Sequence, residues 1–209
     1  MVNLTSEQTE RYSRNIIMRE IGGKGQKKLL SSHVLIIPGI YGELFASSLY
    51  LAAAGIGKIT VIGNESLISY LENFKNEVED LNPDVKFNVL PETHLPNLQS
   101  KIDVVITTLP SKHEYILNNN FIRGVPIVLG SVSDGKGIMT VVSDRKRLQT
   151  YISNHTINNL FPTTAGFLGI LQVVETVKII LGHKHLDEPE RLEFDLLSME
   201  FKTTRRDET

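Results

Sequence analysis

Cysteine is missing from this chain of 209 residues. Its absence excludes disulfide bonds, thiolate metal sites and a cysteine nucleophile that could carry a thioester or a persulfide. A surplus of positive charge is missing too, because 22 Lys and Arg residues stand against 24 Asp and Glu residues, for a net charge of -2. The composition therefore favours neither nucleic acid nor an anionic membrane as a partner. The hydrophobic content of 41% is that of an ordinary globular protein.

The sequence also lacks a long uninterrupted hydrophobic run. Its longest apolar stretch, residues 167–181, is broken by Gln172, Glu175 and Lys178. This pattern predicts a helix in the protein core and not a membrane span. The polar and charged start, MVNLTSEQTERYSRN, predicts no signal peptide, and we expect a cytoplasmic protein.

One stretch organises the rest of the chain. Residues 34–37 form a short apolar run rich in β-branched side chains, typical of a buried strand, and residues 59–62 form a second. Between them, a glycine turn at residues 38–42 leads into a helical pattern over residues 43–54. This order predicts a βαβ unit with a right-handed crossover. In such folds the first turn usually carries a nucleotide site.

The remaining segments predict a single α/β domain over residues 1–209. We expect a helical N-terminal arm (1–31), a Rossmann-like core (34–143), and a C-terminal helix and hairpin (144–209). The sheet should be mostly parallel, with helices on both faces and an antiparallel hairpin at its C-terminal end. The arm should pack on the surface of the domain or contact a partner subunit.

Local patterns predict the individual elements. Thr5 or Ser6 can cap a first helix that continues to Arg19. Residues 22–25 should form a flexible break, and residues 205–209 a disordered tail. Residues 26–30 should form a short helix before the first strand. Apolar spacing predicts further helices over residues 66–81, 113–121 and 166–181, whereas residues 145–160 are ambiguous, with a helix favoured. It also predicts strands over residues 85–90, 103–108, 126–132 and 137–143 and a hairpin at 192–197 and 200–204.

Several segments together carry a resemblance to a known family. They are RYSRNI at residues 11–16, GQKKL at 25–29, LAAAGIGKIT at 51–60, GFLGILQ with ETVK between 166 and 178, and FDLLSMEF at 194–201. In this order they resemble the ThiF/MoeB/HesA family, which includes the activating enzymes of ubiquitin-like proteins. The likeness covers nearly the whole chain, and matches of this length are far more specific than a lone glycine motif.

The resemblance implies a Rossmann-like fold and adenylation of the C-terminal glycine of a small protein, with ATP and magnesium. It also implies a glycine loop at the phosphates, and this sequence departs from that loop. Gly39, Tyr41 and Gly42 lack the G-x-G-x-x-G spacing. Glu43 places a carboxylate where it would repel a triphosphate. A simpler interpretation of this segment is a tight turn that binds nothing.

Further departures concern the ribose and the metal. Gly63 stands where the resemblance implies a ribose-binding acid, and Asn64 or Glu65 could substitute for it from just beyond the strand. Leu109-Pro110 replaces the implied metal-binding Asp-Asn pair. With no carboxylate to hold magnesium, nucleotidyl transfer loses its main charge stabiliser, so we expect no metal site and no cofactor. The His183-Lys184-His185 segment lacks a third ligand nearby and is expected to be a solvated loop.

Arg14 is the functional residue that the resemblance carries over, because its counterpart in the family crosses a dimer interface to the partner's ATP phosphates. The alternative is an ordinary surface ion pair. These observations favour a catalytically degenerate subunit that pairs with itself or with an active ThiF-like subunit, supplies Arg14 in trans and engages a ubiquitin-like or sulfur-carrier protein. A second hypothesis is an active ATP- and magnesium-dependent adenylyltransferase with an unorthodox pocket that uses Glu65. A third is a module that binds another nucleotide without turnover.

Overall fold

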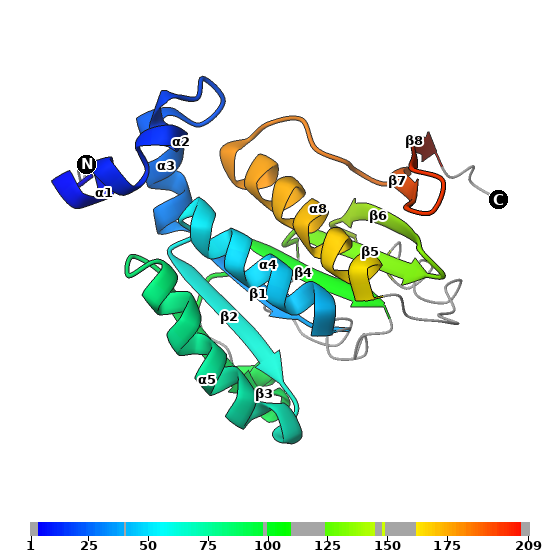
Figure 1. Cartoon of the computed structure of the whole chain (residues 1–209), viewed down its shortest axis with the longest axis horizontal. Helices are drawn as coiled ribbons and strands as arrows, with labels where there is room; N and C mark the ends of the chain where they lie inside the picture. The colour runs from blue at the N-terminus through cyan, green and yellow to red at the C-terminus, as the bar shows by residue number, and fades with distance from the viewer. Residues whose placement is uncertain are drawn as a thin grey trace.

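The computed structural model describes residues 4–39, 41–97, 100–109, 124–144, 148 and 162–205. In these residues eight strands form one sheet in the order β3-β2-β1-β4-β5-β6-β7-β8 (Figure 1). They are β1 (His33–Ile37), β2 (Lys58–Gly63), β3 (Lys86–Pro91), β4 (Val104–Leu109), β5 (Ile127–Ser133), β6 (Lys136–Val142), β7 (Glu190–Asp195) and β8 (Glu200–Arg205). The first five strands pair in parallel, and the last three join antiparallel. The prediction of a mostly parallel sheet with a C-terminal antiparallel hairpin is confirmed.

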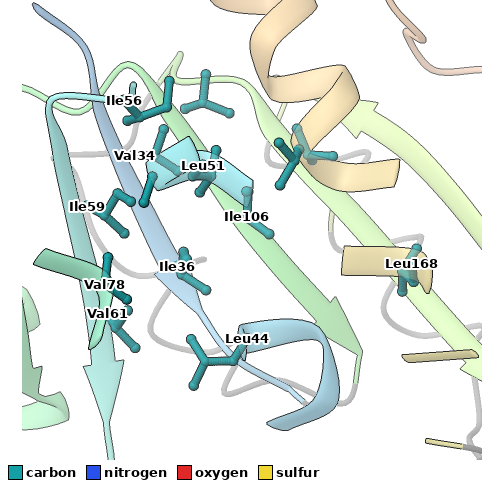
Figure 2. Packing of buried hydrophobic residues seen from close by; sticks show 14 of the residues in the cluster. Val34, Ile36, Leu44, Leu51, Ile56, Ile59, Val61, Val78, Ile106 and Leu168 are labelled. Carbon is teal, nitrogen blue, oxygen red and sulfur yellow. The ribbon is translucent and has the colours of Figure 1, made fainter. Parts of the chain in front are cut away.

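The apolar run at β1 forms the centre of the sheet because it is covered on both faces. All five residues of β1 are buried. Side chains alternate along a strand, so Val34 and Ile36 join the apolar cluster under α4 (Tyr41–Ala54), whereas Leu35 and Ile37 join the cluster on the opposite face. Figure 2 shows Leu51 of α4 beside Val34 of β1. The predicted βαβ unit is therefore the core of the fold.

Three long helices lie over the same face of the sheet in Figure 1. They are α4, α5 (Glu65–Leu81) and α8 (Pro162–Leu181). α4 and α8 run side by side at close distance, because a Cβ atom on Gly169 of α8 would lie only 2.6 Å from the carbonyl oxygen of Glu43. The predicted helices at 113–121 and 145–160 lie outside the described residues, apart from Leu148.

α8 is, among the described residues, the one helix long and apolar enough to cross a membrane, judged by length and composition alone. The core helix of a globular protein meets the same criterion. Here α8 packs against α4 and β5, and it buries Leu168, Gly169 and Gln172 completely. The sequence prediction of a helix packed in the core agrees with this placement.

The N-terminal arm contains α1 (Ser6–Arg11), α2 (Ser13–Ile17) and α3 (Gly22–Ser31). The predicted cap is confirmed, because Thr5 and Gln8 form a reciprocal capping box. The predicted length of the first helix is wrong, because the helix divides at Tyr12 and ends at Ile17, short of Arg19.

The predicted flexible break at residues 22–25 is the first turn of α3. Helix propensity disfavours glycine there, but packing decides the outcome. Gly25 is buried, and a Cβ atom on it would lie 2.9 Å from Cδ2 of Leu181 at the end of α8. Glycine therefore lets α3 approach α8 closely, and the helix forms despite its composition.

The C-terminal hairpin differs from the prediction in both strands, because β7 lies two residues earlier than the predicted 192–197 and β8 is one residue longer than the predicted 200–204. Arg205, expected to begin a disordered tail, is the last residue of β8. Its Nη2 lies 3.0 Å from Oε1 of Glu190 on β7, so the pair extends the hairpin. Residues 206–209 lie outside the described part.

Candidate functional site

The strand order reverses between β1 and β4. The chain proceeds from β1 to β2 and β3 on one side and later continues through β4 and β5 on the other. In open parallel sheets this reversal creates a crevice at the carboxyl ends of the strands, and ligands bind there. Gly39 follows β1, Gly63 ends β2 and Leu109 ends β4. The three positions singled out from the sequence therefore lie along this one edge.

The loop between β1 and α4 is shorter than the sequence suggests. α4 begins at Tyr41, so Tyr41 and Gly42 belong to its first turn and not to the preceding loop. Glu43 is fully buried, and its Oε1 accepts a hydrogen bond from the backbone N–H of Gly39, with 3.3 Å between the heavy atoms. A carboxylate in the first turn is favoured by the helix dipole and by the unpaired N–H groups there. Ile40 and the side chain of Tyr41 lie outside the described part.

Buried polar side chains connect α8 to the ends of β1 and β4. Nε2 of Gln172 donates to the carbonyl oxygen of Thr107 at 3.0 Å and lies 3.2 Å from Oγ1 of Thr108. Oγ1 of Thr107 donates to the carbonyl oxygen of Ile37 at 2.8 Å. All three polar side chains are fully buried. Their hydrogen bonds hold α8, β4 and β1 together beside the crevice. They also give the buried carbonyl groups the partners that such groups need.

A cavity of about 380 Å³ opens at the tips of β2 and β3. Its lining comprises Gly63, Asn64, Glu65, Ser66, Pro91, Glu92 and Thr93. Asn64 caps α5, because its Oδ1 accepts hydrogen bonds from the N–H of Leu67 at 3.1 Å and from the Ser66 hydroxyl at 2.7 Å. Glu65 is the first residue of α5 and is exposed. Both predicted substitutes for the ribose-binding acid thus line the cavity, but the Asn64 side chain is also engaged in capping α5.

Known proteins match this chain over nearly its whole length. No model of a protein family matches the chain. The adenylyltransferase and sulfurtransferase MOCS3 of Aedes aegypti is 29% identical, over 92% of this chain and 52% of that protein. The SAMP-activating enzyme E1 of Haloferax volcanii is 27% identical, over 97% of this chain and 87% of that enzyme. The chain thus spans about half the length of the first relative and most of the second.

Solved structures match the fold of this chain. PaaA matches with a TM-score of 0.71 and 16% identity, over 97% of this chain and 84% of that one. Escherichia coli MccB, solved with ATP, matches with a TM-score of 0.68 and 16% identity, over 96% of this chain and 72% of that one. The chain therefore resembles the ThiF/MoeB/HesA family in both sequence and fold. The structural matches show the fold alone. The relatives that are named adenylyltransferases point to an activity that can be tested in this chain.

The described carboxyl ends of β2 and β4 carry no acidic residue. Gly63 ends β2, and a Cβ atom there would lie 2.9 Å from Cδ1 of Leu71, so a side chain would first meet α5. Leu109 ends β4 and is buried. Among the described residues no group of three or more His, Asp or Glu side chains could hold a metal ion.

The histidine segment after α8 serves as a contact between elements. Nε2 of His183 lies 2.6 Å from the carbonyl oxygen of Glu20 in the arm. Nδ1 of His185 lies 2.5 Å from the carbonyl oxygen of Leu186. The two rings are therefore engaged with backbone oxygen atoms, and the expectation of a loop without a metal site is compatible with these contacts.

Arg14 lies at the opposite edge of the sheet from the crevice. It belongs to α2, which Figure 1 places with α1 and α3 beyond the amino ends of β1 and β2. Its side chain is exposed and makes no hydrogen bond or ion pair with any residue that the structure describes. A guanidinium at this position cannot serve the crevice of its own chain.

The arm is anchored to its own chain by a buried cluster around Tyr12. Tyr12 is 2% exposed, and its hydroxyl accepts from Nδ2 of Asn82 at 2.9 Å. Burial raises the pKa of Tyr12 to about 12. Beside it, Arg11 forms an ion pair with Asp84. The arm therefore packs on its own domain, as one of the two predicted alternatives has it. It also inserts the ring of Tyr12 below the surface of that domain.

A second set of contacts joins three of the segments that carry the family resemblance. Nδ2 of Asn15 donates to Oε1 of Gln26 at 3.0 Å, and Nε2 of Gln26 donates to the carbonyl oxygen of Ala54 at 3.0 Å. Gly55 has φ of +84°, and a Cβ atom on it would lie 2.5 Å from Nε2 of Gln26 and 2.7 Å from Cε1 of Tyr12. We call Tyr12, Asn15, Gln26, Gly55 and Asn82 the arm anchor. Sequence reasoning identified these segments as motifs but not that they meet.

A larger cavity, about 550 Å³, lies on the antiparallel strands β6, β7 and β8. Two ion pairs lie along it, with Lys136 3.0 Å from Asp195 and Lys202 3.0 Å from Glu193. Phe194 and Phe201 contribute the apolar part. The cavity lies beside the carboxyl end of β5, since Lys136 pairs with Ser133. β5 separates it in the strand order from the reversal between β1 and β4, so its size alone does not make it the reactive site.

Proposed function

We propose that this chain binds a nucleotide in the crevice at the carboxyl ends of β1 and β2 and acts in the adenylation of the C-terminal carboxylate of a small carrier protein or peptide. The observation that carries the proposal is the cavity with Glu65 at the tips of β2 and β3, beside the Gly39 loop. Relatives over nearly the whole chain are named adenylyltransferases or a SAMP-activating enzyme. MccB has been solved with MccA.

In this reaction a carboxylate oxygen attacks the α-phosphorus of ATP, and the bond to the bridging oxygen breaks as pyrophosphate leaves. Glu65 is the residue that we assign to the ribose hydroxyl groups, since a carboxylate accepts two hydrogen bonds. Arg14 from a second subunit would neutralise charge on the phosphates.

The proposed role of Arg14 requires a dimer. Arg14 lies on α2, at the edge of the sheet opposite its own crevice, so it could meet phosphates only in another subunit. Ile17, next to it on the arm, is 83% exposed, and Met18 is 48% exposed. Exposed apolar side chains beside a cation suit a protein interface.

A second candidate is the non-catalytic half of a heterodimer, which supplies Arg14 to an active ThiF-type subunit. Two observations favour it: Gly63 and Leu109 stand where the resemblance implies acids, and Glu43 occupies the phosphate loop. In this case the chain alone would have no turnover. The partner protein would be the same class of small carrier.

ATP–pyrophosphate exchange separates the two candidates. The purified chain is mixed with ATP, magnesium, labelled pyrophosphate and candidate carrier proteins that end in glycine. Exchange that depends on the carrier supports the proposed adenylation. If exchange occurs only after an active ThiF-type subunit is added, the heterodimer is supported, and absence of exchange under both conditions contradicts both.

A further inference from the structure

The pairing between β1 and β4 ends where the proposed crevice begins. Ile37 and Thr107 form the last pair of this ladder. Pro38 follows Ile37 and has no N–H group, so the backbone of β1 cannot donate a further hydrogen bond to a neighbouring strand at this point. The carboxyl end of β1 therefore depends on other groups to hold it in place.

The hydroxyl of Thr107 is such a group. Its Oγ1 donates to the carbonyl oxygen of Ile37 at 2.8 Å, and the side chain is fully buried. The bond joins a side chain of β4 to the backbone of β1 across the point at which the strand order reverses. Because the bond is buried, its loss would leave the Ile37 carbonyl oxygen without this partner in a low-dielectric environment.

Thr107 is itself held from the other face of the sheet. Side chains alternate along a strand, so the side chains of Thr107 and Thr108 lie on opposite faces. On the face of Thr108, Nε2 of Gln172 lies 3.0 Å from the Thr107 carbonyl oxygen, 3.2 Å from Oγ1 of Thr108 and 3.4 Å from the carbonyl oxygen of Val128 on β5. One amide group of α8 thus holds β4 and β5, and the Thr107 hydroxyl links them to the end of β1.

We infer that Thr107 is a positioning residue for the adenylation reaction, because its hydroxyl sets the place of the carboxyl end of β1 relative to β4 and thereby the geometry of the crevice. The inference rests on the proposed function, since it assigns a role within the same crevice. Thr107 is fully buried, so it acts through the backbone of Ile37 and not by contact with a substrate. A displacement of reacting groups by about 1 Å can lower a rate by about a hundredfold, so a small shift of this strand end is sufficient.

The test compares variants of Thr107 with a matched threonine elsewhere in the sheet. Thr107→Val keeps the shape of the side chain and removes the hydroxyl, whereas Thr107→Ser keeps the hydroxyl and removes the methyl group. Thr140→Val is the control, because Thr140 is also fully buried in a strand and its Oγ1 donates to the carbonyl oxygen of Glu190 at 2.7 Å. Thr140 lies on β6, outside the reversal between β1 and β4. Carrier-dependent ATP–pyrophosphate exchange and thermal unfolding are measured for each variant of the full chain.

Thr107→Val should lower kcat/KM for exchange by about 10- to 100-fold. Thr107→Ser and Thr140→Val should retain most of the wild-type rate. Both valine variants should lower the midpoint of thermal unfolding, because each loses one buried hydrogen bond. If Thr107→Val does not fold, Thr107→Ala provides the comparison, since it differs from Thr107→Ser only in the hydroxyl and should show the same loss of exchange.

Equal exchange by Thr107→Val and Thr140→Val would overturn the inference and leave the proposed function intact. A loss of exchange in Thr107→Ser as large as that in Thr107→Val or Thr107→Ala would also overturn it, since the hydroxyl would then not be the decisive group. If the wild-type protein shows no exchange with any carrier, alone or with an added ThiF-type subunit, the proposed function is wrong and the inference is wrong with it.

Discussion

The arm anchor and the crevice lie at opposite edges of the same sheet, and they relate to the family in opposite ways. At the anchor, Tyr12, Gln26 and Gly55 come from three family-like segments and fit against one another. At the crevice, the corresponding positions differ, and a glutamate contacts the loop that would hold phosphate. A family motif can thus be retained because it fixes the fold. Resemblance at such motifs is weak support for activity, which depends on the groups at the other edge.

The largest effect that would sharpen this comparison concerns Arg14, which lies on the arm and is proposed to act on another subunit. If the exchange reaction is present, Arg14→Ala should lower it by about 10³-fold, since an arginine supplied in trans has this order of effect. Mixing Arg14→Ala with Gly42→Asp, which carries an intact Arg14 and a blocked crevice, should restore exchange to about a quarter of the wild-type rate in a randomly mixed dimer. No recovery on mixing would contradict the role in trans.

A smaller effect tests whether the anchor is structural. Gly55→Ala places a methyl group against Gln26 and Tyr12 at a positive φ, and should lower the free energy of unfolding by about 2–4 kcal/mol. Gly23→Ala is the control, because nothing lies within 4 Å of a Cβ atom there and the residue is in α3. The control should gain about 0.5–1 kcal/mol. Urea unfolding measures both, and equal stability of the two variants would refute the anchor.

The smallest effect concerns pH and His33, at the amino end of β1. Burial, assisted by the charge of Lys58, lowers the pKa of His33 to about 4, and its Nε2 lies 2.8 Å from Oγ1 of Thr60. Lys101 and Asp103 also face the ring and act in the opposite direction on its pKa. The unfolded chain, with a histidine pKa of about 6.5, then binds the proton more readily. Stability is therefore complete above about pH 6.5 and falls as the pH decreases toward 4.

Between pH 7.5 and pH 5 we expect a loss of about 1–2 kcal/mol from this group. His33→Gln should reduce the pH dependence of the free energy of unfolding, whereas His94→Gln, at an exposed position, should leave it unchanged. Denaturant unfolding at the two pH values provides the measurement. A wild-type slope in the His33 variant would show that other groups cause the loss.

The sequence was sufficient to predict those helices and strands whose apolar residues are the ones that pack in the core. β1, α4 and β2 were predicted from short apolar runs and helical spacing, and the structure has them within two residues of the predicted bounds. α3 was missed in part because Gly22 and Gly25 disfavour a helix locally, and only the contact with Leu181 explains it. Local propensity cannot reveal a contact between segments so far apart in the chain.

The candidate site was predictable in location but not in its contacts. Gly39 and Glu65 were assigned to the correct edge because parallel strands place their carboxyl ends together. The bond from Gly39 to Glu43 had a signal in the sequence, since a glutamate in the first turn often reaches back to an N–H group before the helix. The partnership of Tyr12 with Asn82 had none, because the two residues are 70 positions apart.

The placement of Arg14 has a consequence for how any activity would depend on protein concentration. A lone copy has the crevice at one edge of the sheet and the Arg14 guanidinium at the other. If Arg14 acts in trans as proposed, the complete set of charges exists only when two chains associate. Turnover per mole should then decline on dilution, with a midpoint at the dissociation constant of the pair. A cell could thus regulate such a protein simply through its abundance.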